Sequence, residues 1–463
     1  MNTDEQLMEK IISLCKNRGF IFQAGELYGG LSGIYDYGPL GSLLKNNIKN
    51  LWIKKFVEER RDTYLLDSAI IMGEKALTAS GHVGGFSDPL VDDVKTEKEY
   101  RADHLLEDAG INPEGMSIDE MSQALKDNNI LSPEGNKLGD VREFNLMLKT
   151  QLGSSSDSSS TAYLRPETAQ GIFVNYKNIM DSMHPKLPFG VAQIGKAYRN
   201  EITPRNFIFR LRELEQMEIE YFIHPDDWKN QFDYWREEMN EWSEMIGIDM
   251  NKLYEVEIGE EDRAHYSERT IDFEFDYSFG QKELFGLAYR GDYDLKKHAE
   301  YAKAKLQYTD PHRGETFVPH VIEPSMGLDR TILAILTSAY TEDEVDGNTR
   351  SYLALKPNVA PYKIAVSPLV KNKEHIVEKA NEVFGILKAE FGNVAWDDNG
   401  NVGKRYRRQD EIGTPFCVVV DYDTLDEDHA DFATVSIRHR DTAEQERISI
   451  DELKNYFKEK LSL

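Results

Sequence analysis

Three observations in the sequence predict an α+β protein with more than one domain. Residues 186–223 and 268–295 alternate in the period of two that is typical of strands, while other segments have helical periodicity. Nearer the C-terminus, residues 364–366 and 416–420 have the composition of buried strands, and an amphipathic helix is predicted between them at 371–391. A chain of 463 residues also exceeds the usual size of one domain, so we expect two or three.

Two helices are expected near the N-terminus. In residues 3–18 the apolar side chains of Leu7, Ile11 and Leu14 recur at helical spacing, and Gly19 ends the pattern. Residues 42–59 carry a second apolar stripe of the same period.

An insertion is expected after these helices. Residues 88–162 are rich in charge and in short helical patterns, which predicts a helical region inserted into the main domain. The region ends in the serine-rich tract 153–160, which has little to bury and therefore predicts a loop or linker.

A domain boundary is expected after a further helix at 327–340. The polar run 341–350 and the two prolines that follow it interrupt the regular patterns. We therefore predict a main domain over residues 1–355 and a smaller α/β domain over residues 356–463.

Composition limits the function classes. The 82 acidic and 55 basic residues give a formal net charge of −27, which counts mildly against a nucleic-acid partner, although phosphates respond to local patches. No apolar run of about 18 residues predicts a membrane span, and the acidic N-terminus does not resemble a signal peptide. Cys15 and Cys417 are far apart, which argues against a disulfide framework and favours a cytoplasmic protein.

A charged hairpin is the most informative pattern. Residues two apart share a face of a strand, so Gln193, Arg199 and Glu201 lie together on the first strand. Arg210 and Glu218 share a face on the second strand. Guanidinium groups match the geometry of phosphate, so this face predicts a floor for an anionic ligand. The alternative that the pattern leaves open is a solvated face of an antiparallel sheet.

Three further segments, in a fixed order, carry a family resemblance. They are Tyr35-Asp-Tyr-Gly-Pro-Leu-Gly41, Arg165-Pro-Glu-Thr-Ala-Gln-Gly171 and Glu323-Pro-Ser-Met-Gly-Leu-Asp-Arg330. With them the sequence resembles class II aminoacyl-tRNA synthetases, specifically the homodimeric type of glycyl-tRNA synthetase, over about residues 10–460. The resemblance implies an antiparallel sheet flanked by helices, a C-terminal anticodon-binding domain, and the substrates ATP, glycine and tRNA(Gly).

The resemblance implies roles for residues that match the family's motifs. Arg199 would hold the α-phosphate and the amino acid carboxylate, and Glu201 would accept a hydrogen bond from the adenine amino group. Arg210 and Arg330 would contact the terminal phosphates, and Glu283 would bind Mg²⁺ with ATP. Arg199, Glu201, Arg210 and Arg330 are the predicted catalytic residues. Such groups suit adenylate formation, because fixed arginines and Mg²⁺ relieve the repulsion between two anions.

A second set of residues would recognise glycine. By resemblance, Glu167, Glu218 and Glu323 would surround its ammonium group, Ser325 would close the side of its Cα atom, and Arg290 would lie near its carboxylate. Larger amino acids would be excluded by steric clash, which is easier than rejecting a smaller one.

One position departs from the family pattern. Leu214 stands where the family usually has a phenylalanine whose ring stacks on adenine. Leucine keeps an apolar contact but lacks the aromatic face, so we predict somewhat weaker ATP binding.

The C-terminal domain carries a basic stretch at 403–416 and an alternating segment at 434–441. It resembles the anticodon-binding domain shared by the glycyl, histidyl, threonyl and prolyl enzymes, which would read unpaired bases by stacking and hydrogen bonding. The candidate anticodon contacts are Lys404, Arg405, Arg408, Arg438 and Arg440. A solvated basic helix is the alternative.

The match of Gly38-Pro39 and the following helix to the first class motif implies a homodimer. Two other activities are considered: a catalytically silent relative that binds RNA, which would have lost the motif arginines, and an adenylating enzyme that loads a carrier protein. The eleven histidines show no His-x₃-His or His/Cys cluster, so no zinc is expected. The stretches 80–86 and 101–104 match no role that the sequence identifies.

Overall fold

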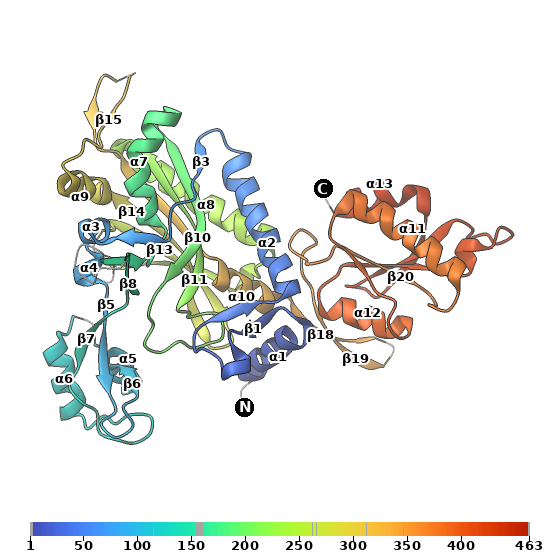
Figure 1. Ribbon diagram of the computed structural model, residues 1–463, viewed down its shortest axis with the longest axis horizontal. Helices are drawn as coiled ribbons and strands as arrows, with labels where there is room; N and C mark the ends of the chain where they lie inside the picture. Colours follow the sequence, from blue (N-terminus) through green and yellow to red (C-terminus); the bar gives the residue numbers. More distant parts are fainter. Residues whose placement is uncertain are drawn as a thin grey trace.

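The computed structural model has three parts, which Figure 1 shows: a large N-terminal body, a unit inserted into it, and a C-terminal domain on the opposite side. The residues described are 3–113, 115–153, 161–261, 263–264, 266–311, 313–345 and 347–461. The serine-rich tract predicted as a loop lies outside the described residues, apart from Gly153.

A seven-stranded sheet forms the centre of the large body, in the order β12-β13-β14-β17-β11-β10-β3. Its strands are β3 (Thr63–Leu65), β10 (Phe189–Tyr198), β11 (Glu213–Ile223), β12 (Leu253–Glu257), β13 (Arg269–Tyr277), β14 (Gly280–Gly291) and β17 (His320–Gly327). Every neighbouring pair is antiparallel except β10 and β3. The alternating segments 186–223 and 268–295 are therefore strands of one sheet, as predicted.

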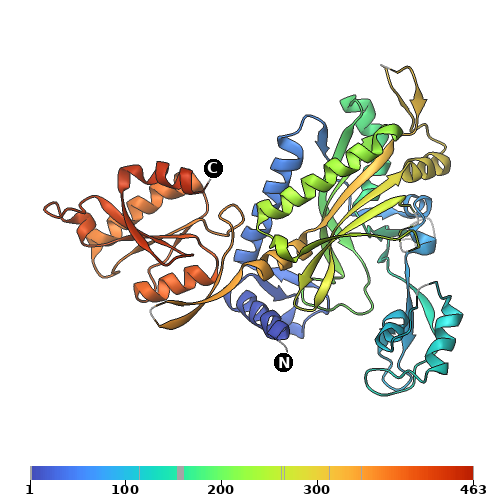
Figure 2. The same cartoon turned by 180° about the vertical axis from the view of Figure 1, so that it is seen from behind.

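Helices cover both faces of this sheet. The helices are α1 (Thr3–Arg18), α2 (Pro39–Ile53, continued by a π-helical turn Lys54–Glu58), α7 (Ala169–Met183), α8 (Trp228–Ile246), α9 (Tyr293–Ala302) and α10 (Leu328–Ala339). Helices α1, α2, α8 and α10 share the main hydrophobic core, which includes the fully buried Trp52, Trp235 and Trp242. Figure 2 shows α8 lying along the sheet. Helices α7 and α9 pack on the other side. The three predicted helices of this body are present.

Strand β11 divides its side chains between the core and the opposite face. Met217, Ile219 and Tyr221 belong to the main hydrophobic core, and Glu218 and Glu220 alternate with them. Glu215 would interrupt the apolar side, but Lys45 and Lys49 of α2 bind its carboxylate at 2.7 and 3.3 Å. On the core side of β11 the charge of Glu215 is therefore paired with lysines, and on the opposite face Glu218 and Glu220 lie on the same side of the strand.

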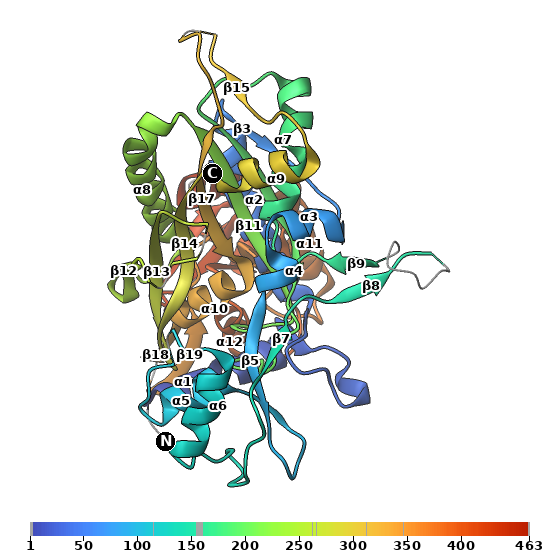
Figure 3. The ribbon, with the colours of Figure 1, turned by 90° about the vertical axis from the view of Figure 1, so that its left-hand side faces the viewer.

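The inserted unit is a small α/β unit rather than the predicted helical region. It contains β5 (Ser87–Asp92), β6 (Glu99–Arg101), α5 (Ala102–Asp108), α6 (Ile118–Asp127) and β7 (Arg142–Asn145), with the strands in the order β6-β5-β7. Val91, Leu106 and Leu125 lie in its own core. Figure 3 shows the unit extending below the large body. Its strands were missed because they are short and their alternation is weak.

Short elements connect the insertion to the sheet. They are α3 (Glu74–Ala79), α4 (His82–Gly85), and a three-stranded sheet of β4 (Ile71–Gly73), β9 (Thr161–Leu164) and β8 (Lys149–Gln151). Elsewhere in the body, β1 (Ile21–Gln23) pairs with β2 (Tyr35–Tyr37), and β15 (Tyr308–Thr309) with β16 (Thr316–Phe317). The Gly38–Gly41 segment passes so close to the turn after α1 that a Cβ atom at Gly41 would lie 1.9 Å from the carbonyl oxygen of Phe20.

The C-terminal domain has the predicted β-α-β arrangement. Its strands, in the order β21-β20-β22-β23-β24, are β20 (Ile364–Pro368), β21 (Val394–Trp396), β22 (Phe416–Val420), β23 (Thr434–His439) and β24 (Gln445–Ser449). Its helices are α11 (Glu374–Phe391), α12 (Val402–Glu411) and α13 (Leu453–Lys460). Strands β20 and β22 are parallel and fully buried, as their continuous apolar sequences predicted.

The polar run 341–350 is not an irregular boundary. It forms the hairpin β18 (Tyr340–Val345) and β19 (Asn348–Leu353), which packs against α12. Arg350 is 2% exposed and binds Asp343 at 2.8 Å and Asp410 at 3.1 Å, so charged residues of this run join the hairpin to α12. Over the described ranges, no helix has the length and apolar character needed to cross a bilayer.

Candidate active site

A cavity of about 360 Å³ opens on the face of the large sheet that carries the even-numbered side chains of β11. It is bounded by β11, β14, β17 and the loop between β10 and β11. Charged side chains are the most numerous class in its lining, with the buried carboxylates Glu218 and Glu323 at one end and the guanidinium groups of Arg199, Arg210 and Arg330 at the other. The predicted residues that line it are Glu167, Arg199, Glu201, Arg210, Leu214, Glu218, Glu283, Glu323, Ser325 and Arg330.

The acidic end is built by three adjacent strands and the start of α7. Glu218 on β11 lies opposite Ser325 on β17, and the Ser325 hydroxyl donates to Glu218 Oε1 at 2.8 Å. The Thr168 hydroxyl donates to the other oxygen of Glu218. One oxygen each of Glu218, Glu220 and Glu323 lie within 4.8 Å of one another. These carboxylates are buried, so they form a compact site for a small cation.

The positive charge of Arg290 compensates part of the negative charge of these carboxylates. It is 1% exposed, donates to Glu323 at 2.7 Å and holds Asp294 at 2.8 and 2.9 Å. The ring of Tyr266 covers its guanidinium at 3.8 Å. Its bonds to two protein carboxylates hold it at the acidic end, and the contact with a glycine carboxylate that the resemblance implies stays a prediction.

The acidic end shifts the pKa of its own members. Burial raises the pKa of Glu323 to about 8, with further upward contributions from Glu218 and against the effect of Arg290. Burial, then the charge of Glu323, raises the pKa of Glu220 well above its ordinary value. Burial and Glu167 also raise the pKa of Glu218. The negative charges at this end are therefore in excess of their partners, and a bound cation would relieve that excess.

Three arginines form the basic end. The Nε atom of Arg199 donates to the carbonyl oxygen of Pro166 at 3.1 Å, which turns the rest of its guanidinium toward the cavity. Arg330 at the start of α10 stacks on the ring of Phe209 at 4.4 Å. Arg210 Nη1 is buried and has no hydrogen-bond partner among the described residues. Burial lowers the pKa of Arg210, as do the charges of Arg101 and Arg330 despite Glu201, so an anion would be favoured there.

Two carboxylates lie beside the basic end. Glu283 on β14 accepts from Arg330 Nη1 at 2.9 Å, and this arginine holds the pKa of Glu283 below its ordinary value. Asp272 on β13 also lines the cavity, and burial followed by the charge of Glu283 raises its pKa to about 7. Leu214 contributes an apolar wall, as the sequence implied.

Sequence reasoning did not assign Glu220, Asp272 or Asp294 to the site. For Glu220 a signal was present, because it continues the alternation of Gln216 and Glu218 on one strand. Both of its carboxylate oxygens are buried without a hydrogen-bond partner in the described part of the chain. Asp294 at the start of α9 is only four positions after Arg290 in the chain, and it pairs with that arginine at 2.8 Å.

Comparison with known proteins agrees with this geometry. A family model described as "tRNA synthetase class II core domain (G, H, P, S and T)" matches residues 152–339, and one described as "Anticodon binding domain" matches residues 363–460. Proteins named "Glycine--tRNA ligase" are similar over nearly their full length. That of Caldanaerobacter subterraneus is 47% identical, covering 98% of each chain, and that of Alkaliphilus oremlandii is 48% identical, covering 99% of each.

The chain belongs to the glycine–tRNA ligase family. A solved structure of prolyl-tRNA synthetase from Cryptosporidium parvum, in complex with L-proline and AMP, has a TM-score of 0.64 to this structure at 16% identity. The match covers 98% of this chain and 74% of the other. At that identity the likeness concerns the fold, which is that of a class II synthetase with a C-terminal anticodon-binding domain.

The basic residues of this family member's C-terminal domain are less exposed than expected. Arg405 and Arg438 are 2% and 6% exposed; Arg405 donates to backbone carbonyls, and Arg438 binds Asp410 at 2.8 and 3.1 Å. Arg440 is 3% exposed and donates to the carbonyl oxygen of Gly413. Their internal bonds do not favour a contact with the anticodon, and that contact stays a prediction. Lys404 is exposed, and Arg408 is partly exposed while bound to Asp397 at 2.7 Å.

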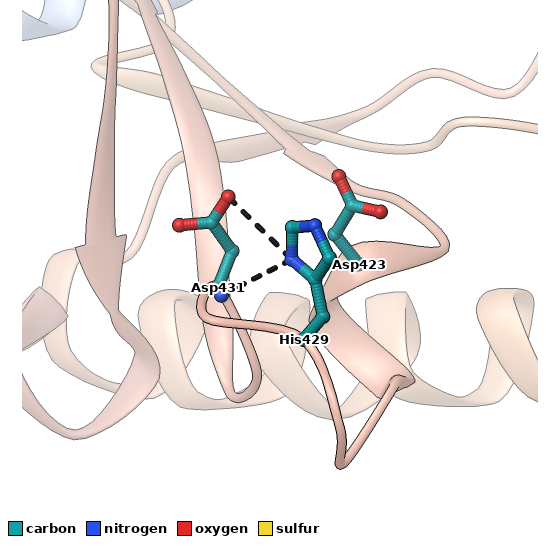
Figure 4. Close-up of side chains that lie close together, drawn as sticks. All are labelled: Asp423, His429 and Asp431. Atoms are coloured by element: carbon teal, nitrogen blue, oxygen red, sulfur yellow. Dashed lines mark hydrogen bonds and ion pairs between the residues drawn. The ribbon is translucent and has the colours of Figure 1, made fainter.

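A group of possible metal ligands lies elsewhere in this domain. Figure 4 shows Asp423, His429 and Asp431 close together, with His429 Nδ1 at 3.7 Å from the Asp431 carboxylate. The guanidinium of Arg447 already lies 4.0 Å from Asp423 and 3.5 Å from Asp431, and it binds Asp421 at 2.8 Å. Because the guanidinium of Arg447 already lies beside these carboxylates, we interpret the group as an ion-pair network that joins β24 to the loop between β22 and β23.

Proposed function

We propose that this chain activates glycine with ATP and transfers the glycyl group to the 3′ end of tRNA(Gly). The observation that carries the proposal is the division of one cavity into an acidic end and a basic end. An amino acid must place its ammonium group at one end and its carboxylate toward the α-phosphate of ATP at the other. A cavity with opposite charges at its two ends matches both requirements.

Glycine would bind at the acidic end. Its ammonium group would lie among Glu167, Glu218 and Glu323, and Ser325 would border its Cα atom. Because β17 and β11 hold Ser325 and Glu218 against each other, little room remains for a side chain on that atom. Selection would then rest on exclusion of larger amino acids, since a residue without a side chain offers nothing else to bind.

ATP would bind at the basic end. Arg199 would contact the α-phosphate, Arg210 and Arg330 the terminal phosphates, and Glu201 the adenine amino group, with Leu214 against the base. A glycine carboxylate oxygen would attack the α-phosphorus while the bond to pyrophosphate breaks. The fixed arginines would balance the negative charge that develops, without needing to reorganise. In the second step the terminal ribose hydroxyl of the tRNA would attack the glycyl carbonyl carbon, and AMP would leave.

A divalent cation fits the basic end. Glu283 and Asp272 both line it, and the raised pKa of Asp272 reports an excess of negative charge that a cation would relieve. Oxygen ligands of this kind suit Mg²⁺, which would be held by Glu283 and the phosphates of ATP. The ion would neutralise phosphate charge when bound. No role for zinc is proposed.

Residues 1–355 are proposed as the catalytic part and residues 356–463 as the anticodon-binding part, with a cytoplasmic location. Exposed Lys404 and partly exposed Arg408 would hold the RNA backbone. A domain suited to reading RNA is of no use to an enzyme that loads a carrier protein.

A homodimer is also proposed. The loop between β1 and β2, next to the start of α2, exposes three apolar side chains: Leu27 at 87%, Tyr28 at 90% and Leu31 at 57%. Exposed apolar groups of this kind often mark a protein interface. A monomeric mass by light scattering at micromolar concentration would contradict this part of the proposal.

Exchange of labelled pyrophosphate into ATP tests the activity directly. The assay would be run with Mg²⁺ and each of the twenty amino acids in turn. Exchange with glycine alone is expected. No exchange from folded protein would overturn the proposed enzyme activity and favour a silent, RNA-binding relative, although such a relative would be expected to lack Arg199, Arg210 and Arg330. Equal exchange with alanine or serine would keep adenylation and reject the assigned glycine site.

A further inference from the structure

The stretch Ser80-Gly81-His82 to Phe86, which the sequence left without a role, forms the segment α3–α4 beside the acidic end of the cavity. Gly81 has a φ of 88°, a left-handed conformation that favours glycine and turns the chain sharply between the two short helices. The turn directs the ring of His82 inward, where it is 8% exposed.

His82 joins this segment to the proposed ammonium site. Its Nδ1 atom lies 2.8 Å from the hydroxyl of Ser80, and its Nε2 atom lies 3.4 Å from Oε2 of Glu167. Glu167 is itself 9% exposed, and its other oxygen accepts from Gln170 Nε2 at 3.0 Å. Both oxygens of Glu167 therefore have protein partners: Gln170 of α7 binds one, and His82 lies beside the other.

The proton on Nε2 follows from the partners of the ring. A carboxylate accepts only, so Nε2 must carry hydrogen to interact favourably with Glu167. The Ser80 hydroxyl can donate to Nδ1, which leaves a neutral ring with its proton on Nε2. If Ser80 instead donates to the carbonyl oxygen of Leu77, which lies at 3.2 Å, Nδ1 must also carry hydrogen and the ring is a cation. In both arrangements Nε2–H faces Glu167.

The opposite end of the segment contacts the basic end of the cavity. The ring of Phe86 lies 5.4 Å from the guanidinium of Arg199 and 5.5 Å from the ring of His82. Backbone hydrogen bonds from Leu146 to Phe86 and from Asn200 to Leu146 tie this contact to the strand that leaves the insertion. One short segment thus borders a residue proposed for the ammonium group and a residue proposed for the carboxylate.

We propose that His82 is a positioning residue for glycine: its Nε2–H fixes the Glu167 carboxylate in the orientation that receives the ammonium group. This inference rests on the proposed function. Burial alone would raise the pKa of Glu167, but His82, Arg290 and Gln170 together lower it, so Glu167 stays charged beside carboxylates whose pKa values are raised. His82 thereby distinguishes one glutamate of the acidic end from the others.

Two substitutions separate positioning from packing. His82→Phe keeps an aromatic ring against Phe86 and removes the donor. His82→Gln places an amide N–H near the position of Nε2 and should restore the contact. An aromatic replacement at exposed His375 on α11, His375→Phe, is the matched control. Glycine and ATP are titrated separately in pyrophosphate exchange, and thermal unfolding of each variant is recorded.

Loss of a hydrogen bond to a charged group predicts a KM for glycine raised roughly 10- to 100-fold in His82→Phe. The KM for ATP should stay within about twofold, and His82→Gln should recover most of the glycine effect. An unchanged glycine KM would overturn the inference, as would a parallel loss for both substrates that glutamine does not restore. If His82→Phe does not fold, His82→Asn, which reaches Ser80 but not Glu167, takes its place under the same criteria.

The failure of this inference can be told from failure of the proposed function. Wild-type protein without glycine-dependent exchange would overturn both. Exchange by the wild-type protein, together with an unchanged glycine KM in folded His82→Phe, would overturn only the role of His82.

Discussion

Glu220 offers the sharpest test of the electrostatics of the acidic end. It is fully buried, neither of its carboxylate oxygens has a partner among the described residues, and an oxygen of Glu323 lies within 4.8 Å. Burial and Glu323 raise its pKa well above the ordinary value of 4.5. The folded protein therefore holds a proton on Glu220 that the unfolded chain has already released above that pH.

The sign and size of the effect follow from this difference. Between the unfolded and folded pKa values the folded state binds more protons, so its stability falls as the pH rises. For one group that differs by a full proton between the two states, the slope is about 1.4 kcal/mol per pH unit. Glu220→Gln copies the shape of the neutral acid and cannot titrate. The variant should match wild type near pH 5 and become progressively more stable than wild type above it.

Thermal unfolding followed by tryptophan fluorescence measures the difference. Trp52, Trp235 and Trp242 are fully buried in the large body, so the signal reports the part that contains Glu220. The stability difference should therefore appear as a gap in Tm of roughly a few degrees that widens as the pH rises. Glu300→Gln on the exposed side of α9 is the control and should show no such trend. Parallel Tm profiles for Glu220→Gln and wild type would refute the reasoning, because Glu220 would then be charged in the folded state.

Four other substitutions test the site and the C-terminal domain. Arg199→Gln should lower the rate of pyrophosphate exchange by roughly 100-fold or more at an unchanged Tm, since fixed charges at a developing anion contribute at least that much; a rate within tenfold of wild type would exclude its role. Leu214→Phe should lower the KM for ATP by adding a ring beside the base, and an unchanged KM would contradict that interpretation. Arg438→Gln should destabilise the C-terminal domain by about 3–5 kcal/mol, because it leaves buried Asp410 with fewer partners. Lys404→Gln should leave the stability of the domain unchanged and raise the KM for tRNA, because Lys404 is exposed. If calorimetry and aminoacylation assays gave the opposite result for these two variants, the roles assigned to Arg438 and Lys404 would be exchanged.

The sheet and most helices could be predicted because their signals are local. Alternation in 186–223 placed Glu218 and Met217 on opposite faces of one strand, and the structure keeps that division. The apolar sequence of β22 likewise predicted a buried parallel strand. The insertion was predicted incorrectly as helical because strands of three to six residues contribute little pattern of their own. Its own small hydrophobic core stabilises them instead.

Charge gave the least reliable predictions, for a physical reason. A sequence shows that Arg438 and Arg440 are basic but not whether a partner lies opposite them. In the fold, Asp410 receives Arg438 and Arg350 together, so residues that look suited to RNA stabilise the domain and its junction. The pairing of His82 with Glu167 joins residues 85 positions apart in the chain, and it too depends on tertiary structure. Burial and partners, rather than residue type, decide which charges are free to act.

The same reasoning explains how an acidic protein can serve anionic substrates. Some of its negative charge is buried or paired: Glu218, Glu220 and Glu323 are buried at one end of the cavity, and Glu215 is paired with Lys45 and Lys49. Burial raises the pKa values of Glu218, Glu220 and Glu323, because it penalises their charged forms. An ammonium group bound among them would favour the charged forms again. Arg199, Arg210 and Arg330 line the other end of the cavity, where Arg330 also donates to Glu283 at 2.9 Å. The net charge of −27 therefore says less about the partners than the local arrangement of charges in the site.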